Sequence, residues 1–239
     1  MAPLGQEDQQ LFRAIVCRNT RMVRARSDIV RECDPPRAVR VILDGWACRY
    51  KELPDGRRQI LAFFLPGDLC DSAVFLLDRM DHSIGAITSV RLAELKPDDF
   101  SRMTREAPDL AEAFALHELV TVAIQREWTL GLGQRTAFER VAHLLCEINR
   151  RLEAVGLTHA GTCEFPLTQD QIASATGLTP IHVNRVLQIL RRRGLIELCR
   201  RRLTLHDRAA LEDEAMFDPT YLHIRPDRRP ASERTAFFP

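Results

Sequence analysis

The spacing of the hydrophobic positions changes along the chain. Between residues 22 and 95, apolar residues form short runs separated by turns, and Gly45, Gly56 and Gly67 recur at an interval of 11 residues. Asp-Gly between strand-like runs is a strong hairpin signal, because glycine readily adopts the positive φ of a tight turn. This pattern predicts a small antiparallel β-barrel or roll. Its strands are expected over 39–43, 47–50, 59–65 and 85–93.

Helical spacing dominates on both sides of this region. Apolar stripes predict short helices over residues 6–16 and 97–105. Residues 109–130 contain no Pro or Gly and are rich in Leu, Ala, Glu and Val, which predicts one helix of roughly 35 Å. Gly131-Leu-Gly133 interrupts the pattern and predicts a hinge. The helical spacing then resumes over residues 136–152.

The long helix carries two apolar faces. One face follows alternating steps of four and three residues, which is the seam of a two-helix contact. A helix with two such faces can pack on its own domain and also on a partner, so we assign this first seam to dimerisation. A single buried core helix is the alternative. The dimerisation seam consists of Leu110, Phe114, His117, Thr121, Ile124 and Trp128, and the second face of Leu116, Leu119, Val120 and Ala123.

The most specific segment, residues 167–187, has the spacing of a helix-turn-helix. If Gln169 is position one, small Ala173 is fifth, where two helices approach closely. Gly177 is ninth, where the turn needs a positive φ. Thr179 can then cap the second helix. The order of these features predicts DNA binding.

The second helix of this motif exposes side chains that can read bases. Arg can bind guanine O6 and N7 together, and Asn or Gln can read adenine. The arginines at 191–193 extend toward phosphates. Residues 194–205 form a strand, a basic turn and a second strand, which together predict a wing. The candidate DNA-binding residues are Thr168, Gln169, Thr179, Ile181, His182, Asn184, Arg185, Gln188, Arg191, Arg200, Arg201 and Arg202.

Charge supports the same interpretation, and composition excludes other classes. The chain has 239 residues, is 45% hydrophobic and has a net charge of +1, but residues 134–206 hold 11 Arg against 6 acidic residues. A basic C-terminal third indicates a nucleic-acid partner. No apolar run approaches the ~20 residues of a membrane span, and the N-terminus lacks the pattern of a signal peptide. A cytoplasmic protein is therefore expected.

The seven cysteines are scattered and include no C-x2-C pair. They offer no zinc or iron–sulfur ligand spacing, so we expect reduced thiols that are mostly packed as small hydrophobes. Thiol sensing through Cys70, Cys146 or Cys199 is an alternative, because the arginines beside Cys199 would lower a thiol pKa. No nucleophile–base motif or phosphate-cradling glycine loop supports an enzyme.

These features together resemble the catabolite-activator and fumarate–nitrate regulator (CRP/FNR) family of bacterial transcription factors, over roughly residues 10–210. Besides the helix-turn-helix, the resemblance rests on Val41-Ile-Leu-Asp-Gly45, Leu65-Pro-Gly-Asp-Leu69 and the run from Arg135 to Leu145. It implies an α+β fold and a homodimer that binds a palindromic operator and contacts RNA polymerase. The implied parts are a cyclic-nucleotide-binding-like β-roll sensor (1–106), a dimerisation helix and hinge (107–133) and a winged helix-turn-helix domain (134–213). The Pro- and Arg-rich composition beyond them predicts a poorly ordered tail (214–239).

The effector site departs from this family. Members that bind cyclic AMP carry a Gly-Glu pair and, about ten residues later, an Arg followed by a small residue. The matching positions here are Asp71-Ser72 and His82-Ser83, so the phosphate would lose its bidentate cationic partner. Cyclic AMP is disfavoured and an iron–sulfur cluster is not expected. No cofactor is firmly implied, and a regulator with an unknown effector or none is the leading hypothesis.

The recognition helix departs as well. Many family members place a Glu, which accepts from cytosine N4, where this chain has Ile181, and some have Arg where it has Pro180. Ile181 could instead contact a thymine methyl. The resemblance carries Arg185 over as the guanine contact. The alternative function is a small-ligand or redox sensor that acts mainly through protein contacts.

Overall fold

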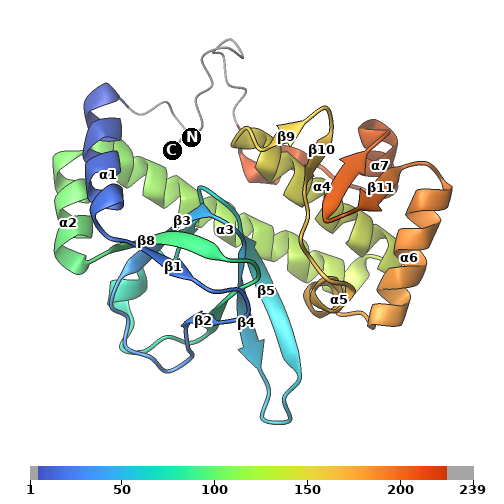
Figure 1. The fold of residues 1–239 in the computed structure, drawn as a ribbon, viewed down its shortest axis with the longest axis horizontal. Helices are drawn as coiled ribbons and strands as arrows, with labels where there is room; N and C mark the ends of the chain where they lie inside the picture. The colour runs from blue at the N-terminus through green and yellow to red at the C-terminus, as the bar shows by residue number, and fades with distance from the viewer. Residues whose placement is uncertain (1–4, 225–239) are drawn as a thin grey trace. The chain divides into compact units, whose positions relative to one another are not determined.

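The computed structural model describes residues 5–224 (Figure 1), which form two compact units. The first unit comprises residues 5–51 and 61–122, and the second comprises residues 52–60 and 123–224. None of the helices within residues 5–224 combines the length and hydropathy that a membrane crossing requires.

Two four-stranded antiparallel sheets build the roll that the sequence predicts. One sheet has the strand order β1-β8-β3-β6 and the other β2-β7-β4-β5. Buried aliphatic side chains of β3 and β8, together with Trp46, belong to the hydrophobic core of the roll. The strands are β1 (Thr20–Val23), β2 (Asp28–Val30), β3 (Val39–Asp44), β4 (Ala47–Glu52), β5 (Arg58–Phe64), β6 (Leu69–Cys70), β7 (Ser83–Ala86) and β8 (Val90–Leu95). The helices of this part are α1 (Gln6–Arg18), η1 (Val74–Leu76) and α2 (Pro97–Glu106).

Two connections in the roll differ from the prediction. The turn at Asp44-Gly45 is not a hairpin, because β3 and β4 belong to different sheets. Gly45 has φ +80°, and a Cβ there would lie 2.1 Å from the carbonyl oxygen of Ser89, so this crossing requires glycine. The expected strand over 85–93 is likewise divided between β7 and β8, which lie in different sheets.

The long helix α3 spans Pro108–Gln134, so Gly131 and Gly133 lie inside it and the expected hinge does not form there. Glycine within a helix costs only about 1 kcal/mol relative to alanine. Arg135 offsets that cost by donating from Nη1 to the carbonyl oxygen of Glu127 at 3.0 Å and from Nη2 to its carboxylate at 2.7 Å. The chain bends at Thr136 instead, which caps the next helix.

A central helix, α4 (Ala137–Ala154), organises the second unit. Every residue from 141 to 149 is buried, because helices and a small antiparallel sheet of order β11-β12-β10-β9 surround it. This sheet and the helix-turn-helix confirm the winged fold. The elements are β9 (Thr158–His159), β10 (Thr162–Glu164), α5 (Gln169–Thr176), α6 (Pro180–Arg192), β11 (Ile196–Cys199), β12 (Arg202–Leu205), α7 (Arg208–Glu214) and η2 (Pro219–Leu222).

The segment after α7 is folded through residue 224, which differs from the expectation of a poorly ordered tail from residue 214. Phe217 and Leu222 are buried, and the hydroxyl of Tyr221 donates to the carboxylate of Glu147 on α4 at 2.9 Å. This carboxylate also accepts from Trp128 Nε1 at 3.0 Å. Two apolar anchors and a buried hydrogen bond therefore hold residues 215–224 on α4. Phe237 and Phe238 lie outside the described residues.

All seven cysteines are free thiols, and three of them, Cys17, Cys33 and Cys199, are exposed. Burial raises the pKa of Cys70 and of Cys146 well above the ordinary thiol value, so neither is a thiolate near neutral pH, and thiolate is the reactive form. Within residues 5–224, no three His, Cys, Asp or Glu side chains are grouped so that they could hold a metal ion.

Candidate DNA-binding site

Helix α5, a glycine turn and helix α6 form the predicted helix-turn-helix. Thr168 caps α5 by accepting from the amide of Gln171, whose side chain accepts in return from the amide of Thr168. Gly177 ends α5 in the left-handed conformation with φ +63°. Thr179 then caps α6 by accepting from the amide of His182. Both threonine hydroxyls among the candidate DNA contacts thus satisfy amides that the helix starts would leave unpaired.

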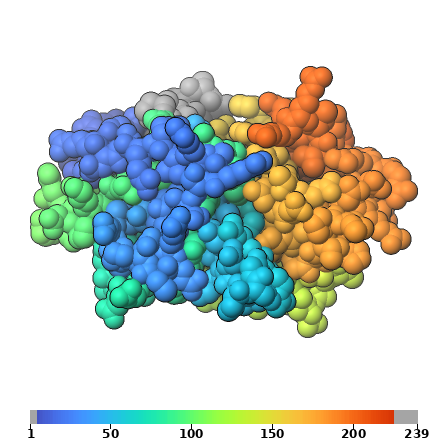
Figure 2. All heavy atoms as spheres, turned by 60° about the horizontal axis from the view of Figure 1, so that its bottom comes forward, coloured from blue at the N-terminus to red at the C-terminus, as the bar shows by residue number. Residues whose placement is uncertain are grey.

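The outer face of α6 carries the residues expected to read bases. Ile181 is 80% exposed, which is unusual for a large aliphatic side chain. Arg185 is exposed, and its guanidinium has no hydrogen-bond or ion-pair partner among residues 5–224. The segment that contains α6 is at the molecular surface in Figure 2, coloured orange. Ile181 and Arg185 line one surface hollow together with Gln169, Pro180, Asn184 and Gln188.

Three amides on this face hold one another in position. Asn184 Nδ2 donates to Gln169 Oε1 at 3.2 Å, which joins α6 to α5. Gln188 Nε2 donates to Asn184 Oδ1 at 2.9 Å. This chain of hydrogen bonds fixes the amide planes beside Arg185 and leaves the remaining donor and acceptor sites of each amide available.

The wing is the hairpin of β11 and β12, and its tip is the two-residue turn Arg200-Arg201. Both residues have positive φ, +48° and +60°, a conformation in which hairpins strongly prefer Asn or Gly. Both arginines are exposed, as is Arg202 at the start of β12. Two cations therefore occupy backbone positions where other residues would cause less strain.

The arginines at the end of α6 differ from the expectation that all three extend toward phosphates. Arg191 donates to the carbonyl oxygen of Leu198 in the wing at 3.2 Å. Arg193 pairs with Glu214 at 2.7 Å and lies over the ring of Phe138, 5.3 Å from its centroid. These two side chains link α6 to the wing, to α7 and to α4, so both interact with groups of the same unit.

Replacing Gly177 by Val is expected to destabilise the protein. A left-handed conformation costs a residue with a Cβ roughly 1–2 kcal/mol, and a β-branched residue pays the most. A Cβ at Gly177 would also lie 2.9 Å from Leu132 Cδ2. The melting temperature, measured by calorimetry, should fall by about 2–8 °C.

Two substitutions check this explanation. Gly177→Asn should lose less stability than Gly177→Val, because Asn tolerates the left-handed region. Gly133→Ala should be neutral or stabilising, since Gly133 is helical and a Cβ there meets nothing within 4 Å. Equal melting temperatures for the Val and Asn variants would rule out the conformational explanation.

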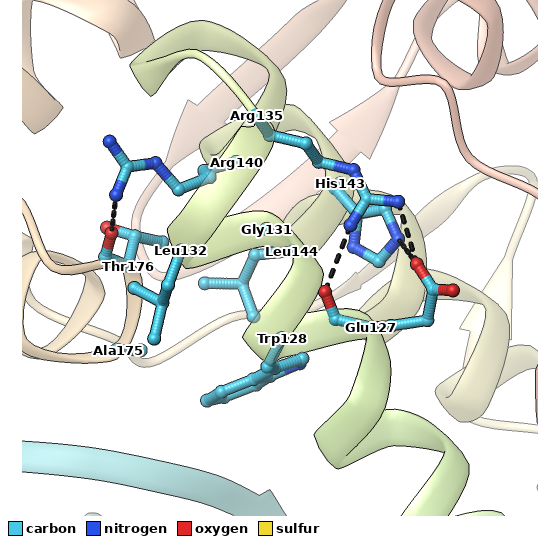
Figure 3. A pocket seen from close by; sticks show the side chains of 10 residues that line it. All are labelled: Glu127, Trp128, Gly131, Leu132, Arg135, Arg140, His143, Leu144, Ala175 and Thr176. Carbon is cyan, nitrogen blue, oxygen red and sulfur yellow. Dashed lines mark hydrogen bonds and ion pairs between the residues drawn. The ribbon is translucent and has the colours of Figure 1, made fainter.

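Below the helix-turn-helix, charged groups join α3, α4 and α5 around a small cavity (Figure 3). Arg135 pairs with Glu127, and Arg140 Nη1 donates to the carbonyl oxygen of Thr176 at the end of α5, at 2.9 Å. Burial, with help from Arg135, lowers the pKa of His143 to about 3, so the imidazole is neutral near pH 7. The cavity of about 30 Å³ has room for roughly one water molecule.

The predicted dimerisation seam of α3 faces the same chain. Leu110, Phe114 and Ile124 are buried. His117 Nε2 accepts from the amide of Leu69 at 3.3 Å, and Trp128 donates to Glu147. Leu110, Phe114 and Ile124 fill the chain's own core and cannot cover a partner, while His117, Thr121 and Trp128 are partly exposed. The dimerisation seam as a whole stays a prediction. The exposed positions of α3 instead follow another seam with steps of four and three: Ala115, Leu119, Val122, Arg126, Thr129 and Gly133.

The four candidate effector residues all have partners in the roll or on α3. Asp71 accepts from Arg49 and lies 3.0 Å from His82 Nε2. Ser72 donates to Glu118 on α3 from both its amide, at 2.7 Å, and its hydroxyl, at 2.6 Å. The structure places Asp71 and His82 in contact and adds Arg49, which the sequence analysis did not single out. An arginine within the apolar strand 47–50 was the available signal.

The fourth candidate, Ser83, is likewise engaged. Its hydroxyl accepts from the amide of Glu32 at 2.9 Å, which links β7 to the segment after β2. Its side chain thus serves the roll's own architecture.

Comparisons with known proteins agree with this geometry. Residues 139–214 match a model of the Crp-like helix-turn-helix domain, and residues 20–107 match the cyclic nucleotide-binding domain. The chain is 33% identical to the nitrogen fixation regulation protein FixK of Bradyrhizobium diazoefficiens, over 72% of this chain and 71% of that protein. It is 30% identical to the transcriptional activator FnrL of Cereibacter sphaeroides, over 73% and 71%. The solved structure of FixK2 from Bradyrhizobium japonicum matches with a TM-score of 0.72 and 28% identity, over 82% of this chain and 96% of that one.

Proposed function

Because the chain belongs to the CRP/FNR family of DNA-binding transcription regulators, we propose that it binds a two-fold symmetric operator as a homodimer and reads each half-site with α6. Its relatives are regulators and not enzymes. The proposal assigns residues that read the operator, residues that contact its phosphates and a surface that forms the dimer.

The exposed guanidinium of Arg185, which has no partner among the described residues, is the observation that carries the proposal. An arginine on the outer face of a recognition helix can donate to guanine O6 and N7 together. Ile181, one turn earlier on the same face, offers an apolar side chain that can contact the methyl group of thymine. Asn184 and Gln188 lie between and beyond them with amides already oriented. We assign base reading to these four residues.

The wing tip supplies phosphate contacts in this proposal. Arg200 and Arg201 stay in a left-handed turn that Asn or Gly would occupy with less strain. Strain of this kind tends to be retained where the side chain serves a function. Two exposed cations at the end of a hairpin are suited to the backbone of duplex DNA, which binds basic groups without regard to sequence.

The exposed seam of α3 is the proposed dimer contact. Leu119 is 63% exposed and Val122 43% exposed, and both lie on the four–three spacing that pairs two helices. A homodimer would present two copies of α6, and the two-fold axis would make the operator palindromic. Contact with RNA polymerase and a cytoplasmic location complete the proposal, in keeping with a regulator of transcription.

Selection of bound sequences from a random DNA pool tests this function. The purified protein, without added ligand, should enrich an inverted repeat whose half-sites are centred about one helical turn apart. Each half-site should contain at least one invariant guanine. Enrichment of a single half-site would contradict the dimer, and no enrichment above random DNA would contradict base reading by the ligand-free protein.

A further inference from the structure

The carboxylate of Asp71 lies where two basic side chains of the roll converge. Its Oδ1 accepts from Arg49 Nη2, and its Oδ2 lies 3.0 Å from His82 Nε2. All three side chains are largely shielded, with exposed fractions of 16% for Asp71, 14% for Arg49 and 9% for His82. Burial alone would raise the pKa of Asp71, but His82 and Arg49 outweigh it and lower that pKa. The group is therefore an anion near neutral pH.

The backbone at this position is one that glycine adopts most easily. Asp71 has φ +56°, which is the left-handed region. Family members that bind cyclic AMP have glycine at the matching position. This chain keeps a side chain in a glycine-like backbone, and that side chain pairs with Arg49 and contacts His82. An unusual backbone held by a specific contact is a pointer to function.

Arg49 is built to hold one anion. Its guanidinium lies over the ring of Phe64, 5.2 Å from the centroid, so the ring covers one of its faces. Its Nε is buried and has no hydrogen-bond partner among the described residues. His82 is held from its other side by Asp81, whose Oδ1 lies 2.7 Å from Nδ1. These supports fix two donors in place around a single carboxylate.

The position of Asp71 is tied directly to the long helix. The next residue, Ser72, donates twice to Glu118 of α3, and Leu69, two residues earlier, donates its amide to His117 of the same helix. The segment 69–72 thus contacts α3 on both sides of Asp71. Because Asp71 is part of this segment, its contacts with Arg49 and His82 also fix the segment and its hydrogen bonds to α3.

We propose that Asp71 is an internal substitute for a ligand phosphate: its carboxylate fills the anion site formed by Arg49 and His82 and holds the β6–α3 contact without a small molecule. The residues present therefore do not fit a cyclic nucleotide, whose phosphate would meet this carboxylate. The inference deepens the proposed function and rests on it only for the consequence that operator binding needs no effector.

Removing the charge should convert the internal contact into a site for external anions. In Asp71→Asn, inorganic phosphate should raise the melting temperature with the logarithm of its concentration above Kd, by roughly 5–10 °C at one hundred times its Kd, with chloride at equal ionic strength as the blank. The wild-type protein should show no such response to phosphate or to cyclic AMP. Asp71→Gly, which relieves the backbone, provides a second variant if Asp71→Asn does not fold.

Asp81→Asn is the matched control. It removes the other carboxylate beside His82, but Asp81 is 76% exposed and does not contact Arg49, so this variant should behave like wild type toward phosphate. The proposal is overturned if wild type responds to phosphate or cyclic AMP as strongly as Asp71→Asn, or if both folded Asp71 variants ignore phosphate. The measurement contains no DNA, so its failure is distinguishable from a failure to select a palindromic operator.

Discussion

Replacing Arg185 by Ala is expected to lower affinity for the selected operator by roughly 30- to 20,000-fold, because a bidentate guanine contact is worth about 1–3 kcal/mol and a dimer loses it in both half-sites. Affinity for random DNA should change little. Fluorescence anisotropy on operator and random duplexes at a fixed salt concentration measures both, and the ratio of the two affinities reports the specificity.

Arg201→Ala is the matched control for this experiment. It removes the same type of side chain, but from the wing tip, where the expected partner is a phosphate. Operator and random DNA should then lose affinity equally, and the slope of log affinity against log salt should fall by about one for each phosphate that the protein no longer neutralises. An equal loss on both DNAs for Arg185→Ala would show that Arg185 contacts the backbone instead of a base.

Placing two carboxylates on the exposed face of α3 is expected to abolish the dimer. In Leu119→Asp/Val122→Asp, each protomer would bring two charges into an apolar helix contact, where they have no partners and repel their copies. Sedimentation velocity should report a monomer at concentrations where wild type is a dimer. Operator affinity should fall by roughly 100- to 10,000-fold, because the second half-site no longer adds to binding.

Leu76→Asp controls for the loss of an exposed leucine in general. Leu76 is 87% exposed and lies in the short helix η1, outside α3. This variant should therefore remain a dimer with unchanged operator affinity. A double variant of α3 that still sediments as a dimer would place the dimer contact elsewhere on the chain.

The helix-turn-helix could be predicted because its signals are local. Thr168 and Thr179 cap helices within three residues of themselves, and Gly177 takes the backbone conformation that its place in the motif requires. Each signal acts over a few positions, and all of them agree. Such agreement across neighbouring residues lets a sequence specify a structure without reference to distant parts.

Features that depend on distant partners were harder to predict. The Asp44-Gly45 turn was recognised, but which strands pair across it is decided by contacts far along the chain, and β3 and β4 lie in different sheets. Arg49 stands out locally as an arginine within an apolar strand, but nothing near it indicates that its partner is Asp71, 22 residues away. Periodicity also shows two apolar faces on α3, but only the packed structure shows that Phe114 belongs to the chain's own core.

The contact between Tyr221 and Glu147 sets a practical limit on how the DNA-binding half can be prepared in isolation. A fragment that stops at residue 213, the boundary drawn from the sequence, would discard Phe217, Tyr221 and Leu222 and expose the surface of α4 beneath them. Glu147 is completely buried, and losing the Tyr221 hydroxyl there would cost about 1–3 kcal/mol. A stable fragment for crystallography or NMR should therefore begin before Trp128 and extend at least to residue 224.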